Sequence, residues 1–175
     1  MFPALGKIKL VIFDIDGTLT DGRIVINSDG TETRFFNVQD GTGIKFLMRN
    51  GVEIAFITAR DSRVVEHRAR ELGVKHVIQG ALKKIDAYNT LLEKVALKDE
   101  EVCVVADDLL ELPLMSRAGF SVAVANAVQE VKDAADYVTT LPGGMGAGRE
   151  VAELILKAQD KWADIIRNYS GGKKI

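Results

Sequence analysis

Apolar runs and helical patterns alternate along this chain. Short, continuously apolar runs bounded by turn residues predict strands at residues 7–13, 52–57, 75–78, 101–105, 120–124 and 136–139. Apolar residues at helical spacing predict helices at 40–50, 62–72, 83–95, 128–134 and onward from 149, with a short helix near 109–115. Because the strands are apolar throughout instead of alternating, we expect a Rossmann-like α/β fold, a parallel sheet covered by helices on both faces.

Two segments fall outside this alternation. The β-prone stretches 23–26 and 31–38 flank an Asn-Ser-Asp-Gly turn and predict a β-hairpin flap over about 22–38. A lone hairpin is marginally stable in water, so it is either a plain surface ribbon or a segment that rests on another surface, such as a second subunit. Residues 142–148, PGGMGAG, predict a flexible connector before a long amphipathic C-terminal helix and tail over about 147–175. We expect one domain over 1–175.

Composition narrows the class of protein. The chain has 175 residues, 47% of them hydrophobic and 27% charged, with a net charge of −2, as in soluble globular proteins. This charge gives no footprint for nucleic acid or an anionic membrane. The single cysteine, Cys103, fits a reducing compartment, and the first ten residues lack a signal-peptide layout, so we expect a cytoplasmic protein.

Polar residues cluster where the predicted strands end. In a parallel sheet the carboxyl ends of the strands share one edge, where ligands bind. The residues found there are Asp14, Asp16, Thr58, Asp107 and Asp108, with Lys84 at the start of the following helix. Each has a plainer explanation: a capped turn for Asp14 to Thr18, a helix cap for Thr58 or the Asp107-Asp108 pair, and a surface lysine for Lys84.

Electrostatics favours a joint explanation. Asp14, Asp16 and Asp107 would repel one another in a cleft unless a hard cation such as Mg²⁺ lay between them. Phosphate oxygens would then be held by Thr58, Lys84 and the main-chain N–H groups of residues 15–18. In this scheme Asp14 is the nucleophile that forms an aspartyl phosphate, and Asp16 is the acid/base that protonates the leaving alcohol and then activates water.

Four motifs, D-I-D-G-T-L-T, I-T-A-R, Q-G-x-x-K-K and V-V-A-D-D, resemble those of the haloacid dehalogenase phosphatase superfamily. Within it, FDIDGTLTDGRI, FNVQDGTGI and GGMGAGREV are most similar to phosphatases of 3-deoxy-D-manno-octulosonate (KDO) 8-phosphate. The resemblance implies a capless, Mg²⁺-dependent enzyme of lipopolysaccharide precursor biosynthesis. It also implies a homotetramer whose hairpins associate and whose subunits complete one another's sites.

The same resemblance implies a ligand set for Mg²⁺: Asp14, the Asp16 carbonyl and Asp107, with Asp108 close by through water or Lys84. Two positions depart from the family pattern. Ala106 replaces the usual glycine and should be tolerated if its φ is not positive. Glu111 replaces an aspartate, which leaves its supporting contact open.

Substrate preference is the least determined point. Arg60 either binds the carboxylate of a sugar acid through its guanidinium fork or pairs with Asp61 or Glu66 on its own helix. A phosphatase for a related nine-carbon sugar-acid phosphate is an alternative, as is a non-catalytic oligomerisation or regulatory module of the same fold. A phosphomutase is disfavoured because no cap is present to exclude water.

Overall fold

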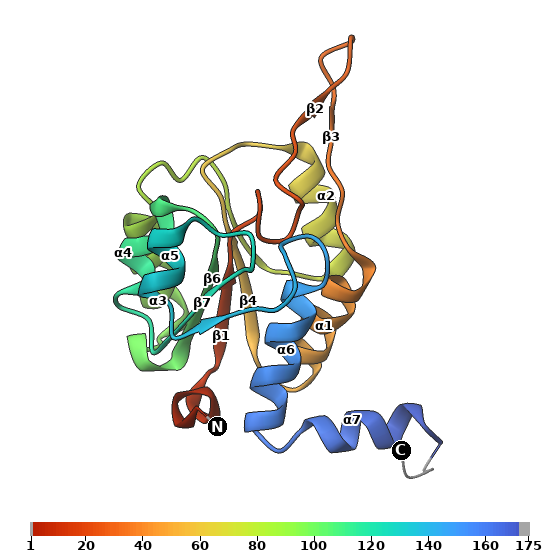
Figure 1. Cartoon of the computed structure of the whole chain (residues 1–175), viewed down its shortest axis with the longest axis vertical. Coiled ribbons are helices and arrows are strands. Elements are labelled where there is room, and N and C mark those ends of the chain that lie inside the picture. The colour runs from red at the N-terminus through yellow and green to blue at the C-terminus, as the bar shows by residue number, and fades with distance from the viewer. Residues whose placement is uncertain (1, 172–175) are drawn as a thin grey trace.

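A computed structural model describes residues 2–171 of the chain (Figure 1). Six parallel strands form one sheet in the order β5-β4-β1-β6-β7-β8. Their bounds are β1 Leu10–Phe13, β4 Glu53–Ile57, β5 His76–Ile78, β6 Val102–Ala106, β7 Phe120–Ala123 and β8 Tyr137–Val138. Strands β1, β6 and β7 are buried along their whole length, as their apolar runs predict, and the expected α/β fold class is confirmed.

Helices cover both faces of the sheet (Figure 1). One face carries α1 (Val38–Arg49), α2 (Arg63–Leu72) and α6 (Ala147–Ala158), with α1 packed along α6. The other face carries α3 (Lys84–Val95), α4 (Leu112–Met115) and α5 (Gln129–Ala134). Short 3-10 turns lie at Pro3–Lys7, Asp99–Glu101 and Leu109–Glu111. No helix among residues 2–171 is both long and apolar enough to cross a membrane.

The sheet has a topological switch point between β1 and β6. From β1 the chain moves through β4 to β5 on one side, and then returns to build β6, β7 and β8 on the other. The crossovers from β1 and from β6 therefore leave in opposite directions, which opens a crevice beyond their carboxyl ends. Asp14 and Asp107 are the first residues after these two strands.

The predicted long C-terminal helix is in fact two helices. Helix α6 ends at Ala158, and α7 runs from Trp162 to Tyr169 at an angle to it (Figure 1). Asp160 between them has φ 57°, a left-handed conformation that a continuous helix does not allow. Trp162 then packs edge-on against Phe46, with ring centroids 6.0 Å apart. The sequence pattern misses the break because Ala158 and Trp162, four residues apart, keep helical spacing across it.

The hairpin is present but shorter than predicted. Strands β2 (Val25–Ile26) and β3 (Glu32–Thr33) pair antiparallel and project beyond the body of the protein (Figure 1). Helix α1 also begins earlier than predicted, because Asn37 provides its cap by accepting a 2.7 Å hydrogen bond from the Gln39 N–H. Asp40, expected to start this helix, instead accepts a hydrogen bond from the Arg149 N–H in the first turn of α6.

The glycine-rich segment 142–148 is not a loose connector. The Gly144 N–H donates to the Thr18 carbonyl at 3.1 Å, in the loop after β1. A Cβ atom at Gly143 would lie 1.8 Å from the Gly17 carbonyl oxygen, so no larger residue fits there without a backbone shift. The prediction of flexibility is wrong, because the glycines serve close approach of two backbones.

Candidate active site

Three carboxylates converge at the switch point. Asp14 after β1, Asp107 after β6 and Glu111 in the following 3-10 turn each offer an oxygen, and these oxygens lie within 4.8 Å of one another. Asp14 and Glu111 are buried, and Asp107 is partly buried. The strand ends thus bring together Asp14 and Asp107, as the sequence predicts, and add Glu111 to them.

Lys84, at the first position of α3, lies among these acids. Its Nζ is 2.5 Å from Asp14 Oδ1 and also forms an ion pair with Glu111. Burial alone would lower the pKa of Lys84, but the charges of Asp14 and Glu111 outweigh this and raise that pKa. A surface role for Lys84 is therefore excluded, and Glu111 makes the supporting contact that the sequence left open.

The pKa values of the three acids are raised even though Lys84 lies among them. Burial, with a further contribution from Asp14, raises the pKa of Asp107 to about 8. The same two causes raise the pKa of Glu111 to about 7. Burial also raises the pKa of Asp14, although Lys84 opposes it. A divalent cation bound by these oxygens would stabilise the ionised carboxylates, and an all-oxygen donor set suits Mg²⁺.

The loop after β1 is held against Asp107. The Thr18 hydroxyl donates to Asp107 Oδ1 at 2.9 Å. Gly17 has φ 96°, and a Cβ atom there would meet Asp107 Oδ2 at 2.1 Å. Asn126 fastens the loop from the far side, because its amide donates to the Gly17 carbonyl and its Oδ1 accepts from the Gly143 N–H. Glycine is therefore required at position 17 by both conformation and space.

Asp16 lies beside this cluster and not in it. Its Oδ1 forms a 2.6 Å ion pair with Nη1 of Arg34, and its Oδ2 accepts a 3.4 Å hydrogen bond from the Thr58 hydroxyl. Electrostatics predicts the Asp16 carboxylate beside a cation with Asp14 and Asp107, but among the described residues Glu111 takes that place. The metal role that the resemblance implies for Asp16 concerns its main-chain carbonyl. Thr58 is not a helix cap, since α2 begins at Arg63.

Arg60 has a partner that the sequence did not indicate, whereas Asp108 has the capping role that the sequence allowed. Arg60 donates from Nη2 to Glu32 Oε1 in the hairpin at 2.7 Å, so neither Asp61 nor Glu66 is its partner. Asp108 Oδ1 accepts a 2.8 Å hydrogen bond from the Leu109 N–H and caps the 3-10 turn that follows. The plainer explanation, a cap, therefore holds for Asp108 and not for Asp107.

A cavity of about 180 Å³ lies beside Asp14, Asp16, Thr58 and Lys84. Among the described residues that line it, acids outnumber bases: Asp14, Asp16, Asp108 and Glu111 against Arg60 and Lys84, with Thr58, Ala59 and Leu110 between them. Ala106, just below, has no positive φ and so accommodates the replacement of glycine. The cavity is suited to an anion only when a cation offsets the carboxylates.

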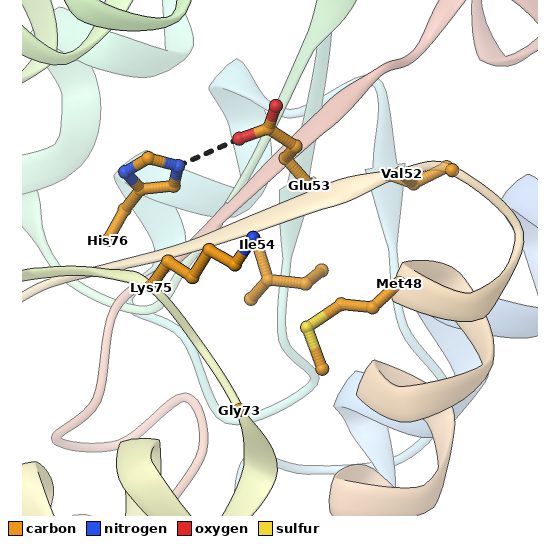
Figure 2. Close-up of a pocket in the computed structure, with 8 residues that line it drawn as sticks. Met48, Val52, Glu53, Ile54, Gly73, Lys75 and His76 are labelled. Atoms are coloured by element: carbon orange, nitrogen blue, oxygen red, sulfur yellow. Dashed lines mark hydrogen bonds and ion pairs between the residues drawn. The ribbon is translucent and has the colours of Figure 1, made fainter.

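A second cavity, of about 340 Å³, lies at the amino ends of β4 and β5 (Figure 2). Figure 2 shows Met48, Val52 and Ile54 on its apolar side. His76 Nε2 lies 2.7 Å from Glu53 Oε2, so these two side chains are paired with each other. Ligand sites in such folds lie beyond the carboxyl ends of the strands, and this cavity lies at the opposite edge of the sheet.

Sequence reasoning missed two charged residues, Glu32 and Arg34 in the hairpin. Glu32 Oε2 accepts hydrogen bonds from Nη2 of Arg34 at 3.3 Å and from the Ser62 hydroxyl at 3.0 Å. Arg34 is buried, which is unusual for an arginine. One signal was available in the sequence. Glu32 and Arg34 are two residues apart in a predicted strand, so their side chains lie on the same face.

The fold and this site define a class. An aspartate-bearing loop after β1, a threonine after β4, a lysine at the start of α3 and an acidic residue after β6 surround one crevice. The sequence profile of the haloacid dehalogenase-like hydrolases matches residues 76–142, from β5 through β8. The chain is thus similar to hydrolases of this class over the four strands β5, β6, β7 and β8, a stretch that includes Lys84 and Asp107.

Relatives over most of the chain narrow the class further. The 3-deoxy-D-manno-octulosonate 8-phosphate phosphatase of Escherichia coli (strain K12) is 46% identical over 155 residues, which are 89% of this chain and 82% of that protein. The crystal structure of the Moraxella catarrhalis phosphatase of that name, with magnesium ion, phosphate ion and KDO, has a TM-score of 0.94 at 42% identity and covers 96% of this chain and 97% of that one.

The Yersinia pestis phosphatase of the same name, solved at 1.95 Å resolution, has a TM-score of 0.91 at 42% identity, covering 93% of this chain and 88% of that chain. The chain belongs to the 3-deoxy-D-manno-octulosonate 8-phosphate phosphatases, a family of haloacid dehalogenase-like hydrolases.

Proposed function

We propose that this protein hydrolyses KDO 8-phosphate to KDO and inorganic phosphate, with Mg²⁺, as a step of lipopolysaccharide precursor biosynthesis. The convergence of the Asp14, Asp107 and Glu111 oxygens within 4.8 Å at the switch point is the observation that carries the proposal. Relatives that bear this activity in their names support the choice of substrate. The Moraxella catarrhalis relative, crystallised with magnesium, phosphate and KDO, supports both the substrate and the metal.

Asp14 is the proposed nucleophile. A carboxylate oxygen of Asp14 attacks phosphorus, and the bond between phosphorus and the sugar oxygen breaks. Asp16 gives its proton to that departing oxygen, which releases KDO as an alcohol. Asp16 then takes a proton from water, whose oxygen attacks the aspartyl phosphate, so that inorganic phosphate leaves and Asp14 is regenerated. The Lys84 ammonium, 2.5 Å from Asp14, orients the nucleophile.

We assign Mg²⁺ to Asp14, Asp107 and the main-chain carbonyl of Asp16. When bound, the ion offsets the charge of the carboxylates and of the phosphate. The raised pKa of Asp107, about 8, fits a carboxyl group whose ionised form needs a cation beside it. Glu111 supports this site through Lys84, and Asp108 supports it by capping the turn that carries Glu111.

We assign phosphate binding to Thr58 and Lys84, and the sugar-acid carboxylate to Arg60. The Thr58 hydroxyl and the Lys84 ammonium both border the 180 Å³ cavity. The guanidinium of Arg60 is already paired with the carboxylate of Glu32, and its side chain is 43% exposed. A carboxylate from a substrate could replace that of Glu32 at the same donors, because both are bidentate acceptors.

We infer that the single domain assembles into a homotetramer in the cytoplasm. Sites that enclose a small molecule usually measure about 300–1,000 Å³, so a 180 Å³ cavity leaves part of the sugar for another wall to cover. The hairpin carries exposed apolar side chains at Ile24, Ile26 and Phe35, which suit contact with another copy. The buried free thiol of Cys103 agrees with a reducing compartment.

Phosphate release from a panel of sugar phosphates, with Mg²⁺ or with EDTA, tests the function. We expect KDO 8-phosphate to have the highest kcat/KM, above nine-carbon sugar-acid phosphates, and EDTA to abolish turnover. Asp14→Asn should remove activity, whereas Asp164→Asn, which neutralises an exposed carboxylate on α7, should leave it unchanged. A preference for a nine-carbon substrate would move the specificity to that alternative. Inactivity on every phosphomonoester would favour a non-catalytic module.

A further inference from the structure

Arg34 is a buried cation that the proposed reaction does not yet use. It lies just after β3, where the hairpin returns to the body of the protein, and its side chain is only 1% exposed. Burying a guanidinium is costly unless charged partners compensate. Two carboxylates do so here: Asp16 at Nη1 and Glu32 at Nη2. The contact with Asp16 is an ion pair by distance, because neither Nη1 of Arg34 nor Oδ1 of Asp16 forms a hydrogen bond among the described residues, and Nε of Arg34 forms none either. The guanidinium is therefore not fully satisfied by its structural partners.

The two carboxylate oxygens of Asp16 have different partners. Oδ1 lies 2.6 Å from Nη1 of Arg34, and Oδ2 lies 3.4 Å from the Thr58 hydroxyl at the cavity wall. One oxygen is therefore held from the hairpin side, while the other faces the crevice. This arrangement limits rotation of the Asp16 side chain, which stands on a loop and not on a strand.

Glu32 connects Arg34 to the opposite wall of the site. Its Oε2 accepts from Arg34 Nη2 and from the Ser62 hydroxyl, and its Oε1 accepts from Arg60 Nη2. Ser62 and Arg60 belong to the loop that follows β4, so the hairpin base is fastened to that loop by charge-assisted hydrogen bonds. The hairpin's own ladder of two residues per strand could not fix a buried side chain by itself.

We propose that Arg34 is a positioning residue for the acid/base Asp16, and that Glu32 holds it in place. This proposal rests on the proposed phosphatase function. It means that the hairpin positions a residue of the active site in its own subunit. Arg34 acts through Asp16 and contacts neither phosphate nor sugar. Its removal should therefore harm most the step in which a proton must reach the leaving oxygen.

Leaving-group dependence separates positioning from structural damage. Alkyl phosphates need a proton on the departing oxygen, whereas p-nitrophenyl phosphate releases a stable phenolate without one. The ratio kcat/KM covers the steps through departure of the leaving group. It should be measured for KDO 8-phosphate, for arabinose 5-phosphate, an alkyl phosphate that lacks a carboxylate, and for p-nitrophenyl phosphate.

Arg34→Met should lower kcat/KM on both alkyl phosphates about 100-fold, near the lower range for general acid catalysis, and on the aryl phosphate less than about 10-fold. Arg34→Lys, which keeps a charge beside Asp16, should recover most of the alkyl activity even if Arg34→Met folds poorly. Arg23→Met is the matched control, because Arg23 is an exposed hairpin arginine that pairs with Asp21 and stacks on the Phe35 ring but contacts neither Asp16 nor Glu32. It should stay within about twofold of the wild type.

Equal losses on alkyl and aryl phosphates would overturn the proposal, as would no loss at all. A loss confined to KDO 8-phosphate would also overturn it, since Arg34 would then serve the substrate carboxylate. Turnover of KDO 8-phosphate by the wild type, measured in the same experiment, tests the proposed function separately. An enzyme that prefers another alkyl phosphate would still show the alkyl-to-aryl contrast if Arg34 positions Asp16.

Discussion

Neutralising Asp107 should stabilise the metal-free protein while abolishing its activity. Burial and Asp14 raise the pKa of Asp107 from 3.8 to about 8. Because the pKa is raised on folding, the folded state prefers the protonated acid. The stability cost is absent below about pH 4 and grows as pH rises toward 8.

The size of the cost follows from the shift. Each pH unit in this window corresponds to about 1.4 kcal/mol, which gives an upper limit of about 4 kcal/mol at pH 7. Asp14 and Glu111 share this repulsion and relax in part, so we expect Asp107→Asn to recover about 2 kcal/mol. For a chain of this length that is a rise in Tm of about 4–8 °C. Asparagine can still accept the hydrogen bond from Thr18.

Thermal unfolding in EDTA between pH 5 and 8.5 measures this effect. The wild type should lose Tm with rising pH, and Asp107→Asn should lose less. Saturating Mg²⁺, at about 100 times its Kd, should stabilise the wild type by about 2.7 kcal/mol and the variant far less. Asp164→Asn is the control for loss of an exposed charge. A variant that is less stable than the wild type in EDTA at pH 8 would refute the electrostatic account of the acid cluster.

Two further substitutions test the packing of the site. Gly143→Ala places a Cβ atom 1.8 Å from a carbonyl oxygen of the loop after β1, so we expect a loss of about 1–3 kcal/mol and at least tenfold in kcat. Gly6→Ala, with open space at that position, is its control; equal behaviour of the two would contradict the close-approach argument. Lys84→Met leaves the buried Asp14 carboxylate without its cation and should cost about 3–5 kcal/mol in urea unfolding, with loss of activity; unchanged stability would contradict a buried ion pair.

The sequence predicted the site where a repeating geometry governs it. Parallel strands that alternate with helices must end at a common edge, so Asp14, Thr58 and Asp107 could be placed together from strand assignments alone. The position of Lys84 followed from the same rule, one helix start further along. Only the order of strands, which puts β1 beside β6, had to come from the structure.

The features that were not predicted leave no periodic pattern in the sequence. The ion pairs between Asp16 and Arg34 and between Glu32 and Arg60 join loops whose separation in sequence carries no regular signal. The break at Asp160 was hidden for the opposite reason, because apolar spacing continued across it while the backbone turned. The periodicity of apolar residues indicates which face of an element is buried, but it does not indicate where the chain changes direction.

The hairpin and the glycine-rich segment both make contacts that their sequences did not indicate. The first was expected as a flap or surface ribbon and the second as a flexible connector, yet each contacts the loop after β1, one through Arg34 and the other through Gly143 and Gly144. Glycine permits disorder, and it equally permits two backbones to touch. Because these contacts hold Asp16 from one side and the Gly17 turn from the other, both segments help to fix the loop after β1 in place. Mutations in either segment should therefore affect turnover before they affect the stability of the sheet.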